Sequence, residues 1–450
     1  MSKMLKKIKK KLNKNTNQQQ PEKKKIDLDK ALNAYYAKVN KPSRHDGNFS
    51  REDDVDLTEE EIKAIDEFWG KYSFAYPVID YDSFKIFKNR YGRFDVRHCP
   101  GGIRVHIFDR FFNNHTYFQA HQNKGMYSLM YPGVNQPKTV LRRMAALLYD
   151  ENYNTMNYKE AYSLLLNELN SGHDLIIKPS GIGGGQMIEF LYAADNNTEE
   201  DIKEAIRPLG TIAMVVQRVM KQSPFMDKFN DSSLNTIRVT TLLYKGKVIP
   251  LGALIRMGAP GSKLDNYTQG GAVLGVDVKS GLCNKWAMTH DLERVTTLPS
   301  GLVLDNEDLH IPNFDKIVES VVRMHYLTPY NRLISWDMAL DENDVPTMIE
   351  NNFAGSLQLH EAVGGPLFGE YMEELLDNYL IKEFNVEFKT KDWVYKEYHD
   401  HIVAMKYRGN ESTAVIPAEV KGKPVTKVEK DAFKNCKTEV ITVVDNRRER

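Results

Sequence analysis

The sequence contains few cysteines and no long apolar run, and each shortage excludes a class of protein. Its 450 residues include only three cysteines, which are far apart and form no CxxC motif: Cys99, Cys283 and Cys436. Neither a disulfide-stapled scaffold nor a cysteine-rich zinc site is therefore expected. No stretch approaches the roughly 20 apolar residues of a membrane-spanning helix, and Met1 is followed by lysines rather than by an apolar signal core. We expect a cytoplasmic protein.

An overall excess of charge is also lacking, because 61 basic side chains balance 61 acidic ones. Hydrophobic residues make up 41% of the chain and aromatic residues 10%, which excludes a fully disordered or collagen-like chain. A chain of this length can bury one large core or two to three medium ones. The even balance hides a basic head, since residues 1–25 carry ten lysines and the single acid Glu22.

The basic head, residues 1–25, permits two interpretations. Its apolar residues fall at helical spacing among the lysines, so an amphipathic helix could lie on an anionic membrane surface: Met4, Leu5, Ile8 and Leu12. The alternative is a solvated, disordered tail over residues 1–50. Nucleic acid is not expected as a partner, because the body shows no aromatic platform interleaved with basic residues. For the location of the protein, we expect the cytoplasm and leave open a peripheral position at the inner face of the membrane.

Two helix starts carry reciprocal capping signals. Thr58 is followed three residues later by Glu61, and Asn157 is followed by Glu160. Each pair predicts a capping box at a helix N-terminus. The first helix should bury a stripe of Ile62, Ile65, Phe68 and Trp69, and the second should bury Ala161, Leu164, Leu165 and Leu169 before ending at Gly172.

A glycine-rich loop joins two short predicted strands, residues 174–178 and 186–191. Its glycines leave backbone N–H groups uncovered, so the loop could close over phosphate oxygens while Lys178 supplies a point charge. The loop matches neither the Walker pattern nor GxGxxG before a helix. A mobile surface turn is the alternative for this segment.

A second predicted hairpin carries hard oxygen ligands. Residues 333–340 alternate with period two, residues 341–344 form a turn, and residues 345–352 return as a strand. Glu350 and Asn352 share a face, with Asp337 expected diagonally across from them. Two carboxylates and one amide oxygen suit Mg²⁺. The polar outer face of an exposed hairpin is the alternative.

These features, in this order, resemble the ATP-grasp superfamily. Asn123-Lys124 is similar to the first lysine site of that superfamily, Lys178-Pro179 with the glycine loop to the second, and Val216 to Met220 to the adenine hinge. Asp337, Glu350 and Asn352 are similar to its metal triad. The resemblance implies an α+β fold in which two subdomains clasp ATP.

Within the superfamily, the chain most resembles the sugar-transfer-associated ATP-grasp family over about residues 110–385. The supporting segments are SLNTIRVTTL from Ser233, IRMG from Ile255, Asp265-Asn266 through Gly270-Gly271, Ser335-Trp336-Asp337 and Glu350-Asn351-Asn352. One departure is Gln217, which stands where many relatives have a glutamate.

The resemblance implies roles for individual residues. It implies ATP and Mg²⁺ as cofactors, with the nucleotide held by Lys124, Lys178, Gly181, Gly183, Gly184, Gly185, Gln217 and Val219. The metal would be held by Asp337, Glu350 and Asn352, and the catalytic arginines would be Arg238 and Arg256. The acceptor pocket would be lined by Asp265, Asn266, Gly270, Gly271, Gly355 and Ser356. The scattered histidines are interpreted as structural or solvated, with His360 singled out because it closely follows the triad.

The domain organisation expected from these patterns has four parts. They are a basic tail at residues 1–50, a mixed helical region at 51–120, an ATP-grasp catalytic domain at 121–390 and a small module at 400–445. The last segment resembles one unit of a BspA-like leucine-rich repeat. A single unit cannot bury a continuous core alone, so it should serve as an appended interaction module.

Two classes of function follow from the sequence. The resemblance implies an ATP-dependent carboxylate-amine ligase, or a related enzyme that forms an acyl phosphate, acting on a small-molecule or glycan-linked carboxylate and an amine or other nucleophile. The family's name adds a setting in cell-surface polysaccharide biosynthesis or modification. The alternative is a non-catalytic ATP-binding scaffold that works through the C-terminal repeat.

Overall fold

The computed structural model describes residues 51–444, except for 76–78, 105–107, 181–186, 211, 354, 356, 435 and 439. The basic head and most of the glycine loop therefore lie outside the described residues. No helix in the described part of the chain combines the length and the apolar character needed to cross a membrane.

Both predicted capping boxes are present. Helix α3, Glu59–Trp69, begins at Thr58, whose side chain accepts from Glu61 N–H while the Glu61 side chain accepts from the backbone of Thr58. Helix α9, Tyr158–Asn170, begins with the same reciprocal pair at Asn157 and Glu160. The buried stripe of α3 is narrower than expected, because Ile65 and Trp69 are buried but Ile62 is 37% exposed.

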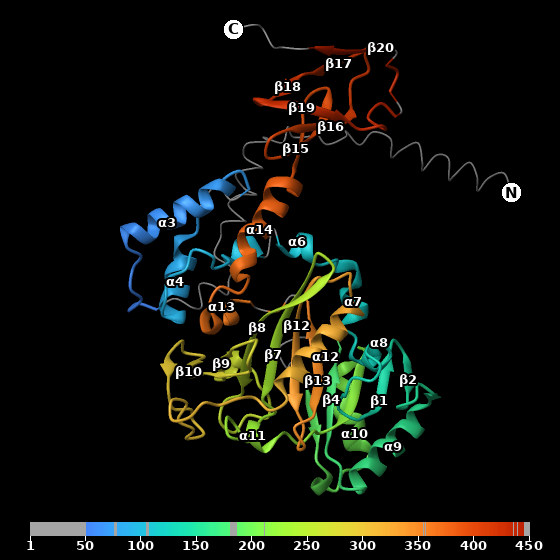
Figure 1. Cartoon of the computed structure of the whole chain (residues 1–450). Coiled ribbons are helices and arrows are strands. Elements are labelled where there is room, and N and C mark those ends of the chain that lie inside the picture. Colours follow the sequence, from blue (N-terminus) through green and yellow to red (C-terminus); the bar gives the residue numbers. More distant parts are fainter. Residues whose placement is uncertain are drawn as a thin grey trace, which may run out of the picture. The chain divides into compact units, whose positions relative to one another are not determined.

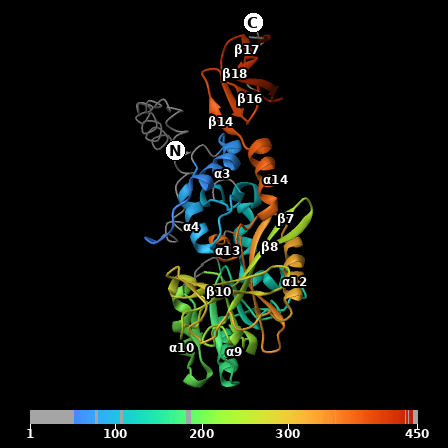
Figure 2. The ribbon, with the colours of Figure 1, turned by 60° about the vertical axis from the view of Figure 1, so that its left-hand side comes forward.

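The first of two large sheets has six strands in the order β3-β2-β1-β6-β4-β5, and all of its pairs are antiparallel. In that order the strands span Thr155–Met156, Leu147–Tyr149, Thr139–Met144, Met214–Arg218, Leu175–Pro179 and Glu189–Leu191. Helices α9 and α10, Glu199–Ile206, contact each other, and their apolar residues share one core with this sheet (Figures 1 and 2). Strands β4 and β5 form the hairpin predicted around the glycine loop.

The second sheet has seven antiparallel strands in the order β11-β10-β9-β8-β7-β12-β13. They span Arg294–Val295, Cys283–Thr289, Ala272–Val276, Lys247–Met257, Thr236–Tyr244, Leu333–Leu340 and Pro346–Asn352. Helix α12, Phe314–Tyr326, packs its apolar stripe against one face of this sheet (Figure 1). Its buried residues share a core with Trp336 of β12. Helix α13, Gln358–Gly364, and α4, Tyr81–Tyr91, cover part of the other face. The uncovered part of that face carries the predicted site residues.

Short helices connect the main elements. They are α5 Gly101–Ile103, α6 Asp109–Phe112, η5 Lys124–Met126, α7 Phe118–His121, α8 Tyr127–Met130, α11 Pro224–Asp227 and α14 Met372–Leu376. The β7–β8 turn uses Lys245 and Gly246, both at positive φ, as tight two-residue hairpins require. Helices and antiparallel sheets together give the predicted α+β class.

The C-terminal segment forms two small sheets. One has the order β14-β15-β16-β19-β18, with strands Val386–Lys389, Trp393–Glu397, Ile402–Tyr407, Lys423–Val428 and Glu419–Val420. The other pairs β17, Thr413–Pro417, with β20, Val440–Val444. The pairs β16–β19 and β17–β20 are parallel. The first sheet begins before residue 390, and the repeat assignment of this segment stays a prediction.

Candidate functional site

The metal-triad candidates lie together on β12 and β13. Asp337 pairs directly with Glu350, and Ser335 pairs with Asn352. The expected diagonal position of Asp337 is thus wrong for Glu350, because a register shift between Asp337 and Met338 brings the two carboxylates opposite each other, and it holds for Asn352. The Asn352 amide lies 3.1 Å from Asp337 Oδ2 and 3.4 Å from Glu350 Oε1, so it bridges them.

Asp337 is held by both predicted arginines. Arg238, opposite it on β7, donates from Nε to Oδ1 at 2.6 Å and from Nη2 to Oδ2 at 2.7 Å. Arg256 on β8 donates from Nη1 to Oδ2 at 3.1 Å. Burial opposes ionisation of Asp337, but the arginines prevail and hold the pKa of its carboxyl below the usual range. In the same way Asp337 overcomes the burial of Arg238 and raises the pKa of its guanidinium.

Lys124 reaches the triad from the short helix η5. Its Nζ lies 3.0 Å from Glu350 Oε2. The adjoining helix α8 is tied to β13, because the Tyr127 hydroxyl donates to Asn351 Oδ1 at 3.0 Å and the Asn351 amide donates to Tyr131 Oη at 2.8 Å. Asn351 points to the opposite side of β13 from Glu350. One face of β13 therefore anchors the segment that carries Lys124, and the other face presents Glu350 to that lysine.

Lys178 comes from β4 of the other sheet and is buried. Its ammonium makes no ion pair with any residue among those described. Burial, assisted by the nearby charge of Lys124, lowers the pKa of Lys178 to about 8. A buried cation that pairs with no described carboxylate is suited to an anionic ligand.

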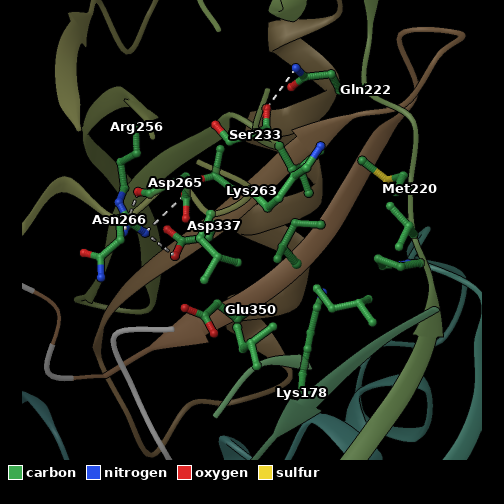
Figure 3. A pocket seen from close by; sticks show the side chains of 18 of the residues that line it. Lys178, Met220, Gln222, Ser233, Arg256, Lys263, Asp265, Asn266, Asp337 and Glu350 are labelled. Atoms are coloured by element: carbon green, nitrogen blue, oxygen red, sulfur yellow. Dashed lines mark hydrogen bonds and ion pairs between the residues drawn. The ribbon is translucent and has the colours of Figure 1, made fainter. Parts of the chain in front are cut away.

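These side chains face one cavity of about 820 Å³, shown in Figure 3. Lys124, Lys178, Arg238 and Arg256 line it, together with all three triad residues: Asp337, Glu350 and Asn352. Apolar side chains form another part of its wall: Ile176, Ile188, Phe190, Val219, Met220 and Ile349. The cavity therefore combines an apolar wall with a strongly charged floor.

Two of the predicted acceptor residues, Asp265 and Asn266, also line the cavity. Asp265 accepts a hydrogen bond from the Thr236 hydroxyl and lies 3.5 Å from Arg256 Nη1. Burial raises the pKa of Asp265, although Arg256 opposes the shift. Gly355 lines the cavity too, and a Cβ there would lie 3.1 Å from Ser335 Oγ.

Other candidates lie away from the cavity. Gly270 and Gly271 do not line it, and a Cβ on Gly271 would lie 2.3 Å from the Met257 carbonyl oxygen, so close packing explains that glycine. Gln217 points toward β1 and donates to Thr139 Oγ1 at 3.1 Å. The predicted phosphate-loop glycines lie outside the described residues: Gly181, Gly183, Gly184 and Gly185. Ser356 lies outside them too.

The cavity also contains residues that the sequence did not single out. Lys263 lines it and forms no ion pair within the described part of the chain, and Thr236 faces Arg256 across β7 and β8. Lys263 lies two residues before Asp265, so the polar loop around Asp265 is the sequence feature that could have identified Lys263 as a cavity residue. His360, by contrast, is buried away from the cavity wall and bonds to Thr240 at 2.9 Å. Burial and Arg238 lower the pKa of His360 to about 3, which keeps it neutral.

The donor set fits a hard cation. No group of three or more His, Cys, Asp or Glu side chains with metal-binding geometry occurs among the described residues. The triad here contains two carboxylates and an amide, and the Asn352 contacts show that all three side chains converge on one point. Mg²⁺ commonly takes one or two carboxylates and completes its shell with phosphate oxygens and water. The residues present therefore fit Mg²⁺ accompanied by a phosphate ligand.

Residues 106–373, more than half of the chain, match the model of the sugar-transfer associated ATP-grasp family. The chain belongs to that family. This confirms the resemblance stated from the sequence and agrees with the predicted cofactors, ATP and Mg²⁺. No curated protein sequence matches the chain.

Solved ATP-grasp structures resemble this family member only distantly. Biotin carboxylase from Campylobacter jejuni is 12% identical, with a TM-score of 0.36 over 58% of this chain and 46% of that one. The D-alanine–D-alanine ligase from Bacillus anthracis is 14% identical, with a TM-score of 0.33 over 60% of this chain and 68% of that one. The L-amino acid ligase from Bacillus licheniformis is 14% identical, with a TM-score of 0.34 over 71% and 60% of the two chains. The chain spans about half the length of the carboxylase.

Proposed function

We propose that the protein is an ATP-dependent ligase that activates a carboxylate as an acyl phosphate and joins it to an amine or another nucleophile. One observation carries this proposal. Lys124, Lys178 and the two arginines, Arg238 and Arg256, line one 820 Å³ cavity together with two carboxylates and one amide. Such a cavity suits phosphoryl transfer, in which the protein mainly positions the reactants and neutralises charge.

The nucleotide would occupy the space between the two large sheets. The apolar wall, which includes Ile176, Phe190 and Ile349, offers an adenine site, while Lys124 and Lys178 supply charge for the phosphates. Lys178 lies near the end of strand β4, and the glycine loop follows this strand in the sequence. The loop would therefore cover the phosphates that Lys178 contacts. Gln217 and Val219 belong to the segment proposed as the adenine hinge.

Asp337, Glu350 and Asn352 would hold Mg²⁺. When bound, the metal supplies positive charge that neutralises phosphate oxygens. The chain's own contribution is to fix the three ligands on rigid, paired strands, with Arg238 orienting Asp337 from the neighbouring strand.

Arg256 is the arginine better placed for the reacting groups. Its side chain is 15% exposed against 8% for Arg238, and its fork of donors fits the oxygens of a transferring phosphoryl group or an acyl phosphate. Asp265, Asn266 and Gly355 would border the acceptor. In the second half of the reaction a C–N bond forms as the C–O bond to phosphate breaks, and phosphate leaves with the electron pair.

The cellular setting is also part of the proposal. The family's name supports an acceptor linked to cell-surface polysaccharide, and the basic head supports a position at an anionic membrane surface. The C-terminal sheets would serve as an interaction module of the leucine-rich repeat type. Deleting residues 1–25 should then reduce binding to anionic liposomes but not to neutral ones.

Hydroxylamine trapping tests the ligase activity. The full-length protein would be incubated with MgATP, hydroxylamine and pools of amino acids, sugar acids and cell-wall carboxylates, and hydroxamate and ADP would be measured. We expect hydroxamate from one pool, because hydroxylamine attacks an acyl phosphate directly. Glu350→Gln should abolish it, since the change removes one metal-binding charge at nearly constant volume.

The control separates the ligase from a non-catalytic scaffold. Thermal unfolding of Glu350→Gln should match the wild type, which excludes misfolding as the cause. Nucleotide binding without hydroxamate or ADP from any pool would favour the scaffold that uses the C-terminal module. Turnover that persists in Glu350→Gln would remove the triad from the mechanism.

A further inference from the structure

Three acids in the cavity are paired with two of the cations that a nucleotide would need. Glu350 pairs with Lys124 at 3.0 Å, and Asp337 and Asp265 both contact Arg256 Nη1, at 3.1 and 3.5 Å. The side chains of Lys124 and Arg256 are 13% and 15% exposed, so water screens these pairs only partly. Each pair therefore joins an acid of the cavity to a cation that phosphate would need.

Each of these pairs conflicts with the binding of one ligand alone. A metal ion at Glu350 and Asp337 must compete with the Lys124 ammonium and the Arg256 guanidinium for the same carboxylate oxygens. A phosphate at Lys124 and Arg256 must draw those cations away, which leaves Glu350 without its ion-pair partner and leaves Asp337 with Arg238 as its remaining cation. Losing a cation at these partly buried carboxylates is unfavourable. Arrival of both ligands together gives every charged group a new partner.

We propose that Lys124 and Arg256 are specificity-determining residues that make the site select the metal–nucleotide complex over free metal or free nucleotide. Each cation stays paired with a carboxylate until the metal binds the carboxylate and the phosphate binds the cation. This inference rests on the proposed function, because it assumes that the cavity binds a nucleotide.

Two other cations in the cavity behave differently. Arg238 holds both oxygens of Asp337 at 2.6 and 2.7 Å, a geometry that orients the carboxylate and leaves its outer lone pairs open. Lys263 has no ion pair with a described residue. Removing Lys263 changes the charge of the cavity as much as removing Lys124 does, but it frees no carboxylate. Lys263 is therefore the matched control for Lys124.

The test measures each ligand alone and then in the presence of the other. Mn²⁺ serves as the metal probe, because electron paramagnetic resonance reports its free concentration, and ADP affinity is measured by calorimetry in EDTA and in saturating Mg²⁺. For the wild type we expect ADP affinity to rise at least about tenfold with Mg²⁺. Linkage requires the metal to gain the same factor from ADP.

The decisive comparison uses Mn²⁺ without nucleotide. Lys124→Met should bind Mn²⁺ about tenfold more tightly than the wild type, because the metal no longer competes with Lys124 for Glu350. The factor by which Mg²⁺ raises ADP affinity should shrink in the same variant. Lys263→Met should change Mn²⁺ affinity by less than about twofold. Arg256→Met provides a second variant with the same expected gain, and thermal unfolding verifies the fold of each.

Three outcomes would overturn the inference. They are equal Mn²⁺ affinity in Lys124→Met and the wild type, an equal gain in Lys263→Met, and ADP binding in the wild type that is indifferent to Mg²⁺. A wild type that binds no ADP under either condition would instead refute the proposed function, and so the two failures are distinguishable.

Discussion

Arg238 and Asp337 form a buried, two-point ion pair between neighbouring strands. Nε and Nη2 of the arginine lie 2.6 and 2.7 Å from the two carboxylate oxygens, and the two side chains are 8% and 2% exposed. The residues are direct partners in the β7–β12 register. The pair fixes the orientation of the first proposed metal ligand before any metal arrives.

This pair predicts a specific pattern of stability. Arg238→Met should lower the free energy of unfolding by about 3 kcal/mol, near the lower end for a broken buried ion pair, because Arg256 and Asn352 still contact Asp337. The double variant Arg238→Met with Asp337→Leu should recover most of that loss, since no buried charge is left unpaired. Urea unfolding followed by tryptophan fluorescence measures both. A double variant no more stable than the single one would contradict the ion-pair interpretation.

Local signals in the sequence predicted much of the fold. The capping boxes at Thr58 and Asn157 depend on residues three positions apart, and the hairpin carrying Glu350 depends on alternation and one turn. Such features are read correctly because the interacting groups are close in sequence. The same alternation placed Asp337 on the outgoing strand of that hairpin.

Long-range geometry could not be obtained in this way. The pairing of Lys124 with Glu350 depends on Tyr127 and Asn351 meeting across two distant segments. A register shift beside Asp337 brings it opposite Glu350, and alternation alone does not predict such a shift. A glycine motif does not distinguish a ligand loop from a tightly packed turn, so the acceptor role of Gly271 stays a prediction.

Gly271 provides a test of that distinction. Gly271→Ala should lower the free energy of unfolding by about 2 kcal/mol, because the added Cβ would lie 2.3 Å from the Met257 carbonyl oxygen and the backbone must shift. Gly70→Ala is the control, since a Cβ there has no atom within 4 Å and the residue adopts a helical conformation. It should be neutral or slightly stabilising. A Gly271→Ala protein of normal stability that loses only acceptor affinity would restore the ligand role.

His325 predicts a dependence of stability on pH. Trp336 Nε1–H donates to Thr241 Oγ1 at 2.8 Å, the Thr241 hydroxyl donates to His325 Nδ1 at 2.7 Å, and His325 Nε2–H donates to the Asn331 carbonyl at 3.0 Å. This chain requires a neutral ring. Burial lowers the pKa of His325 to about 4, against the upward effect of its bond to Asn331.

Because the folded-state pKa of His325 lies below its unfolded value near 6.5, its contribution is present above pH 6.5 and is lost as the pH falls toward 4. Between pH 7.5 and 5.0 the loss should be about 2 kcal/mol. Urea unfolding at the two pH values should show a smaller difference in His325→Gln than in the wild type. Equal pH dependence in the wild type and His325→Gln would refute the assignment.

Lys178 predicts that nucleotide affinity falls at alkaline pH. Burial and Lys124 lower the pKa of this lysine to about 8, so the free protein loses the ammonium charge as the pH rises through that value. If phosphate binding requires that charge, affinity for MgADP should fall about tenfold from pH 7 to pH 9, as the protonated fraction falls by that factor. Lys178→Arg should largely remove the pH dependence, because the guanidinium stays charged throughout. Lys263→Arg, the same change at another lysine that lines the cavity, should keep the wild-type profile. Calorimetry at the two pH values makes the comparison, and an undiminished alkaline loss in Lys178→Arg would assign the titration to another group.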